Sequence, residues 1–182
     1  FNLIPYASAS LSKDYEENKD WQTTPGAGLD AKIGIGSGMN LDITINPDFS
    51  QVEIDQQVVN LTRFDVQLPE KRTFFLENGD LFGNFGIPPL RPFFSRRIGL
   101  DNNDEPLAIL AGLRLSGNLN TDTRLGVMTM QTAKKDSVPT RNNTAIAFKR
   151  RIFGRSTLSG YFLNREGFHR GEIQKSGFSR NA

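Results

Sequence analysis

Short runs in which apolar and polar residues alternate recur along most of this chain. Odd positions are apolar and even positions are polar or glycine over residues 27–35, and residues 39–45 repeat the pattern after Gly36-Ser37-Gly38. Alternation with a period of two predicts β-strands, and the short Gly-Ser-Gly connection predicts a hairpin. Comparable runs occur at residues 3–11, 107–115, 124–131, 144–152 and 158–162. We therefore predict an all-β fold of about seven antiparallel strands in up-and-down order.

The connections between these strands alternate in length. Short turns are expected at residues 36–38, 117–120 and 153–155, and longer polar connections elsewhere. Tight turns at one end of a sheet and long loops at the other are typical of outer-membrane β-barrels. Nine residues at about 3.3 Å each, tilted by about 45°, span roughly 21 Å, which is close to the apolar band of such barrels. The pattern favours the N-terminal portion of a transmembrane β-barrel, and a soluble β-sandwich is the alternative.

A long segment, residues 46–99, interrupts the strands. It is rich in phenylalanine and in charged residues, which is atypical of a disordered segment. Several prolines and glycines prevent it from forming long regular elements. We predict a folded, irregular insert within one domain that spans residues 1–182.

The charges of the insert are nearly balanced, and arginine predominates over lysine. Arginine forms two-pronged hydrogen bonds with carboxylates and tolerates partial burial. We therefore expect a network of ion pairs that holds the insert as a plug or gate inside a polar lumen. The alternative is an external loop with solvated charges. The plug predicts that Arg72 and Arg97 are poorly accessible to solvent. The candidate network residues are Glu53, Arg63, Glu70, Arg72, Glu77, Arg96 and Arg97.

Composition narrows the class of protein. The chain has 182 residues, 37% of them hydrophobic, and a mean hydropathy of −0.43, and no stretch is apolar enough for a membrane helix. The formal net charge of +2 is too small for a dedicated nucleic-acid binder. The chain contains no cysteine, so it has no disulfide framework. It begins and ends abruptly, and we interpret it as a mature or partial chain.

Four blocks in and beside the insert also carry a family resemblance. They are Asn-Pro-Asp-Phe-Ser-Gln-Val-Glu at 46–53, Asn-Leu-Thr-Arg-Phe at 60–64, Pro-Glu-Lys-Arg-Thr-Phe-Phe-Leu-Glu at 69–77, and Phe-Ser-Arg-Arg-Ile-Gly at 94–99. Together they resemble a family of bacterial envelope proteins catalogued as domain of unknown function 5916. In that family an outer-membrane barrel usually follows a domain similar to carbohydrate-binding module family 9. The resemblance implies a Gram-negative outer membrane and no particular chemistry. The chain departs from the family pattern at Thr73, where a proline is expected.

The residue types that carry most catalysis are sparse. His169 is the only histidine, and no serine has the surroundings of a hydrolase nucleophile. The glycines at 34–38 lack the lysine and helix of a phosphate loop, and residues 101–105 do not match an EF-hand. Glu53 and Asp55 are two residues apart, a spacing that could serve acid–base work, but the neighbouring arginines favour salt bridges. A hydrolase is the third hypothesis. We predict no enzyme activity, no cofactor and no metal site.

These inferences combine into one hypothesis. The chain is predicted to be an outer-membrane β-barrel protein of Gram-negative bacteria, structural or transport-related, with a charge-balanced plug. Its expected partners are outer-membrane lipid and either other envelope proteins or the remainder of its own barrel, because open strand edges demand pairing. The alternative is a soluble β-sandwich that binds glycans.

Overall fold

The structure, a computed structural model, describes residues 1–13, 21–48, 69–86, 91–101, 106–135, 138–169 and 172–181. Within these ranges eight strands form one sheet in the order of the sequence, β1 to β8, and each strand pairs antiparallel with the next. The strands are β1 (Asn2–Ser12), β2 (Gln22–Ile35), β3 (Met39–Ile45), β4 (Ile109–Asn118), β5 (Thr123–Thr132), β6 (Thr140–Ile152), β7 (Ser156–His169) and β8 (Glu172–Asn181). The predicted all-β, up-and-down antiparallel order is confirmed.

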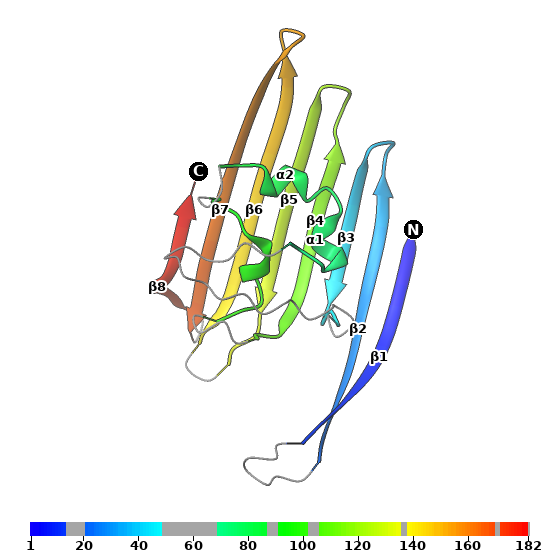
Figure 1. The fold of residues 1–182 in the computed structure, drawn as a ribbon, viewed down its shortest axis with the longest axis vertical. Coiled ribbons are helices and arrows are strands. Elements are labelled where there is room, and N and C mark those ends of the chain that lie inside the picture. Colours follow the sequence, from blue (N-terminus) through cyan, green and yellow to red (C-terminus); the bar gives the residue numbers. More distant parts are fainter. Residues whose placement is uncertain are drawn as a thin grey trace.

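The three short turns lie at the same end of the sheet, as predicted. They connect β2 to β3, β4 to β5 and β6 to β7, at the top of Figure 1. At the β6–β7 turn, Phe153 and Gly154 both have a positive φ, of 48° and 74°. β8 was not predicted, because residues 172–181 are polar and show no clear alternation.

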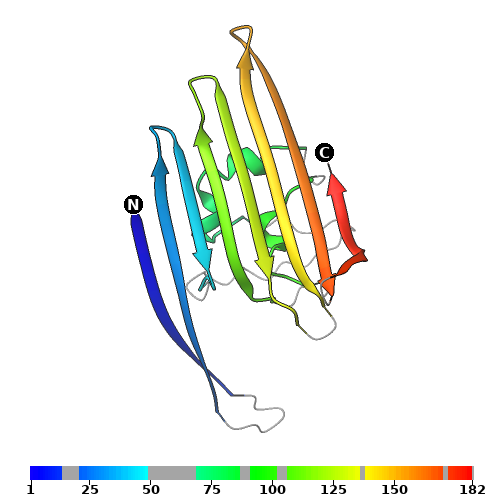
Figure 2. The ribbon, with the colours of Figure 1, turned by 180° about the vertical axis from the view of Figure 1, so that it is seen from behind.

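The sheet is open within the described residues. β1 pairs only with β2 and β8 only with β7, so each has an edge that no described strand covers. Figures 1 and 2 show the two edge strands at opposite sides of the sheet. The transmembrane barrel therefore stays a prediction, while the single antiparallel sheet is established.

The register places different chemistry on the two faces. Residues directly opposite one another in neighbouring strands lie on the same face of a sheet. One such row crosses β2 to β7 and is entirely apolar: Ile33, Leu41, Leu115, Val127, Ile146 and Phe162. The adjacent row, on the other face, is charged at one end and apolar at the other: Lys32, Asp42, Arg114, Met128, Ala145 and Leu163.

The described part of the segment between β3 and β4 lies on the second of these faces. It contains two short helices, α1 (Thr73–Leu76) and α2 (Asp80–Gly83), and a 3₁₀ turn, η1 (Ser95–Arg97). Figure 1 shows these elements in front of the middle strands, and the reverse view in Figure 2 shows the other face without them. We call the two surfaces the insert face and the bare face.

The hydrophobic core lies between the insert and the middle strands. Its buried members come from the insert, from Ile109 at the start of β4, and from the insert face of β5 and β6: Phe75, Leu81, Phe82, Ile98, Ile109, Met128, Met130, Ala145 and Ala147. The large apolar side chains of the bare face are outside this core. On β6, for example, Ala147 is 1% exposed, whereas its neighbours Ile146 and Phe148 are 36% and 39% exposed.

The helices that the structure describes are too short to cross a membrane.

Candidate functional site

The candidate site is the junction between the insert and the insert face of the sheet. Its centre is Arg114, which projects from β4 and is only 2% exposed. Arg114 donates hydrogen bonds to Asp42 Oδ2 on β3, from Nη2 at 2.7 Å and from Nε at 3.2 Å. Asp42 and Arg114 are directly opposite in the register, so the strand pairing itself sets this contact. The carboxylate offsets part of the cost of burying the guanidinium.

Arg114 also binds the main chain of the insert. Its Nη1 donates to the carbonyl oxygen of Glu77 at 2.6 Å and to that of Phe74. These carbonyls belong to the last turn of α1, whose final C=O groups have no partner within the helix. The Phe74 ring lies 5.2 Å from the guanidinium carbon. One buried side chain of the sheet thus supplies the C-terminal cap that α1 lacks in its own sequence.

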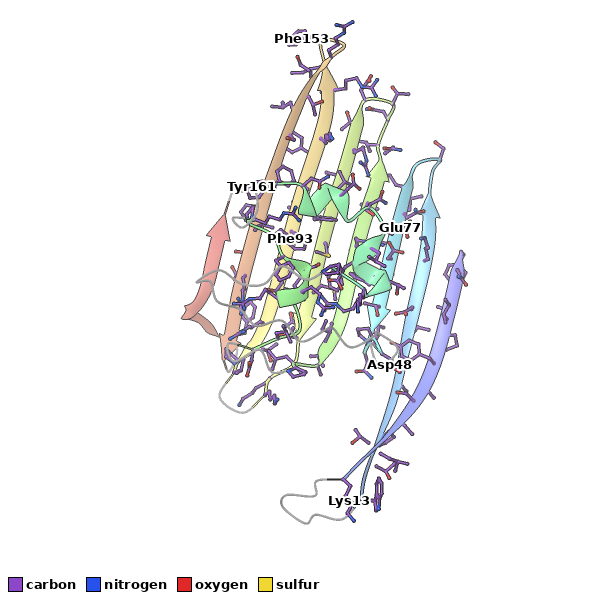
Figure 3. The ribbon with its side chains drawn as sticks, viewed as in Figure 1. Lys13, Asp48, Glu77, Phe93, Phe153 and Tyr161 are labelled. Atoms are coloured by element: carbon purple, nitrogen blue, oxygen red, sulfur yellow. The ribbon has the colours of Figure 1, made fainter. Side chains whose placement is uncertain are left out.

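The carboxylate of Glu77 makes a second connection to the sheet. It accepts a hydrogen bond from Lys32 Nζ on β2 and another, at 2.8 Å, from Asn40 Nδ2 on β3. Arg114 Nη2 lies 3.6 Å from the same carboxylate. The hydrogen bond from Lys32 is the main reason that the pKa of Glu77 is lowered, and it outweighs the opposing effect of burial. Figure 3 shows Glu77 on the α1 side of the junction, over β3.

A third connection anchors the residues around α2. Arg124 of β5 donates to both carboxylate oxygens of Asp80, at 2.6 and 3.0 Å, and this hydrogen bonding lowers the pKa of Asp80. Arg124 also reaches the side-chain oxygen of Asn78, whose amide nitrogen donates to Ser116 on β4. Asn78 has a φ of 51°, a conformation that asparagine tolerates better than most residues. Both members of the Arg124–Asp80 pair are partly exposed, so this connection is weaker than that of Arg114.

Arg72 and Glu70 hold the insert together internally. The Arg72 guanidinium forms a two-pronged pair with Glu70, at 2.9 and 2.8 Å, and donates to the carbonyl oxygens of Ile98 and Ser95. It lies 4.3 Å from the centre of the Phe75 ring. Burial raises the pKa of Glu70, but the hydrogen bonds and charge of Arg72 outweigh it, so the pKa is lowered overall. Arg72 therefore fixes the segment before α1 to the segment around η1.

Apolar packing completes the junction. The Phe82 ring of α2 sits directly over Gly126 of β5, where an added Cβ atom would lie 2.6 Å from the ring. Phe82 also packs 5.8 Å from Phe93, and Phe85 packs 4.7 Å from Tyr161 of β7. The absence of a side chain at Gly126 thus creates the space that α2 occupies.

The predicted network residues differ in burial and in pairing. Glu70, Arg72 and Glu77 form ion pairs within or beneath the insert, and Arg96 is half-buried. Arg72 is 8% exposed, as the plug predicts. Arg97 is exposed, so the prediction that it is poorly accessible is wrong: it is the last residue of η1, a short turn at the surface of the insert. Glu53 and Arg63 lie outside the described residues, and their predicted pairing is not tested.

The sequence reasoning missed the partners that the sheet contributes. Polar positions of the predicted strands hold Lys32, Asp42 and Arg114, and Arg124 begins a further predicted strand. None of the four is among the predicted network residues, because the insert was expected to balance its charges internally. The structure corrects this, because Glu77 and Asp80 find their partners on β2, β4 and β5. The sequence did contain a signal for these contacts. Cationic residues occupy the polar positions of the strands, on the face expected to line a lumen, and the insert that would lie against this face is rich in carboxylates.

The arrangement is suited to holding a polypeptide segment. Arg72, Arg114 and Arg124 each bind a carboxylate, and the first two also donate to carbonyl oxygens of the insert. Among the described residues, no group of three or more histidine, cysteine, aspartate or glutamate side chains is placed to hold a metal ion.

The fold and the junction define a class of protein: an antiparallel β-sheet that carries a long, charge-latched insert on one face. The chain belongs to the family described as Domain of unknown function (DUF5916), whose family model matches residues 1–149. The matched range covers β1 to β5, the insert and most of β6. No curated protein matches the chain. No solved structure matches it either.

Proposed function

We propose that the sheet is part of the wall of an outer-membrane β-barrel and that the insert is a plug or gate on its luminal side. The role of such a barrel is structural or transport-related. In this proposal the bare face contacts lipid and the insert face lines the lumen.

The observation that carries the proposal is the unbroken apolar row on the bare face. Six consecutive strands contribute Ile33, Leu41, Leu115, Val127, Ile146 and Phe162 to it. No described segment covers this face. Large exposed apolar patches mark surfaces that contact a membrane or another protein. Transmembrane barrels show this division, with apolar residues outward and polar residues inward along every strand.

The lengths of two central strands agree with this division. β4 and β5 have 10 residues each. At about 3.3 Å per residue and a tilt of about 45°, ten residues span roughly 23 Å, close to the apolar band of about 25 Å in such barrels. The short turns at one end of the sheet then correspond to the periplasmic side.

The insert also argues for a barrel with more strands than the eight described. An eight-stranded barrel is just wide enough for its own side chains to fill. A lumen that accommodates α1, α2 and η1 needs a wider barrel. The open edges of β1 and β8 are the places where further strands, from the same protein or a partner, would pair.

Spin labels on opposite faces of β6 test the proposal. Because the chain contains no cysteine, single labels can be attached to Ile146→Cys on the bare face and to Lys149→Cys on the insert face. In lipid bilayers we expect the label at 146 to collide mainly with oxygen, which dissolves in lipid. The label at 149 should collide mainly with a water-soluble nickel complex.

The β-sandwich gives a different pattern. There the bare face packs on a second sheet, and the label at 146 is shielded from both reagents. That result, or purification of the folded protein as a monomer from the soluble fraction without detergent, contradicts the proposal. Folded wild-type protein that needs detergent and shows heat-modifiable gel mobility supports it.

A further inference from the structure

A cavity between the insert and the sheet is the starting point. Its volume is about 210 Å³, and it lies where residues 92–98 of the insert pass over β5 to β7. This is smaller than the usual range of about 300–1,000 Å³ for ligand pockets, so it suits a short ligand. Arg114, Glu77 and Asp80, whose ion pairs connect the insert to the sheet, do not line this cavity.

Two arginines line the cavity from separate elements. Arg97 comes from η1 and Arg165 from β7. Within the described part of the chain, the charges that act on Arg165 are those of Arg97 and of Arg141, and all three residues are cationic. Among the described residues, none gives the Arg165 side chain a hydrogen bond or an ion pair.

This arrangement contrasts with the rest of the junction. Arg72, Arg114 and Arg124 each bind a carboxylate. Arg165 is half-buried beside like charges, and a partly buried cation without a counter-charge is unfavourable. A bound anion relieves this cost, because a guanidinium offers a carboxylate a planar, two-pronged set of donors.

The other residues that line the cavity indicate the chemistry of the rest of the ligand. Most of the other contacts are apolar and come from Phe93, Phe94, Ile98, Met128 and Leu163, while Asn143 adds an amide. Figure 3 shows Phe93 over the middle strands, on the insert side of this region. A small polar group beside an apolar wall is the usual composition of a site for a small organic ligand.

We propose that this cavity binds a small amphipathic carboxylate, with its anionic group on Arg165 and Arg97 and its apolar body against Phe93, Phe94 and Leu163. The inference goes beyond the proposed function and does not depend on it. The cavity lies between insert and sheet whether the bare face meets lipid or protein.

Fluorine NMR with 4-fluorobenzoate as the probe tests the site in the purified protein. The wild type should bind the probe saturably, and 4-fluorobenzyl alcohol, which has the same ring without the charge, should bind much more weakly. Arg165→Gln should weaken binding of 4-fluorobenzoate by about tenfold or more, the effect of losing a charged hydrogen-bonding group. Arg155→Gln, at an exposed arginine in the β6–β7 turn, is the matched control and should leave binding unchanged.

Two results overturn the proposal. One is the absence of saturable binding of 4-fluorobenzoate by the wild type, or equal binding of the neutral alcohol. This comparison needs no variant and stands even where Arg165→Gln does not fold. The other is equal affinity for 4-fluorobenzoate in folded Arg165→Gln and wild-type protein. Loss of binding in Arg165→Gln together with its retention in Arg155→Gln supports the site, whatever the spin labels on β6 report.

Discussion

The two faces of the sheet, built from the same strands, differ in the size and burial of their side chains. On the insert face, small and flexible side chains such as Gly126, Met128 and Ala147 are buried beneath the insert. On the bare face, larger apolar side chains such as Ile146 and Phe148 remain exposed. In a soluble protein the largest apolar residues usually form the core. The strands thus carry small or flexible side chains where the insert covers them, and larger apolar side chains on the face that no described segment covers.

The faces also differ in how they treat charge. The insert face buries Arg114 and half-buries Asp42 and Glu77, with partners that balance their charges. The apolar row of the bare face, from β2 to β7, has no charged member. The insert is therefore held by specific contacts, whereas the bare face is suited to non-directional apolar contact.

Replacement of Arg114 should have the largest effect on this difference. Arg114→Met removes the cap of α1 and leaves the Asp42 carboxylate half-buried, and we expect a loss of about 3–5 kcal/mol in the free energy of unfolding. Denaturant unfolding measures it. Arg155→Met, at an exposed arginine, should change the value by less than about 0.5 kcal/mol. Equal effects of the two substitutions would show that the Arg114 cluster does not hold the insert.

Filling the space at Gly126 should have an intermediate effect. In Gly126→Val, the Cβ position lies 2.6 Å from the Phe82 ring, so α2 must move, at a cost of about 1–3 kcal/mol. Hydrogen exchange of residues 80–83 should increase. Combining Gly126→Val with Phe82→Ala should cost less than the sum of the two single changes, because the clash is then absent. Strict additivity would contradict direct packing of Phe82 on this glycine.

Acidification should have the smallest effect and should act on the insert face alone. The pKa values of Glu77 and Asp80 are lowered in the folded state, so their contribution is fully present above the ordinary carboxyl pKa and is lost as pH falls through the lowered values. We expect hydrogen exchange in residues 73–83, corrected for its intrinsic rate, to increase below about pH 4. Glu77→Gln should flatten this dependence. If the corrected exchange rate of the wild type does not change down to about pH 2, protonation of Glu77 and Asp80 does not loosen the insert.

Much of the fold could be predicted from local pattern. Alternation over residues 27–35 and 39–45 indicated both strands and the hairpin between them, because side chains of a strand point to opposite faces in turn. The register of a short hairpin follows from its turn. The sequence therefore indicated that apolar residues of neighbouring strands would lie opposite one another on one face. β8 escaped prediction, since its polar and glycine-containing sequence carries no such period.

The candidate site was predictable only in part. Glu70 and Arg72 are both among the predicted network residues, and the structure pairs them with each other. The partners of Glu77 could not be predicted from local sequence. Lys32 and Arg114 are both distant from Glu77 in the chain, so no short block contains Glu77 together with either partner. Exposure of Arg97 also depended on where η1 meets the surface, which no local pattern records.

The sequence by itself determined seven of the strands, their order, and the division of those strands into an apolar and a polar side, since these follow from the two-residue period of the extended chain. The tertiary structure alone decided which polar side the insert covers, which strand charges it meets, and where Arg165 is left beside other cations. These contacts join residues that are far apart in sequence, and only the pairing of the strands brings them together.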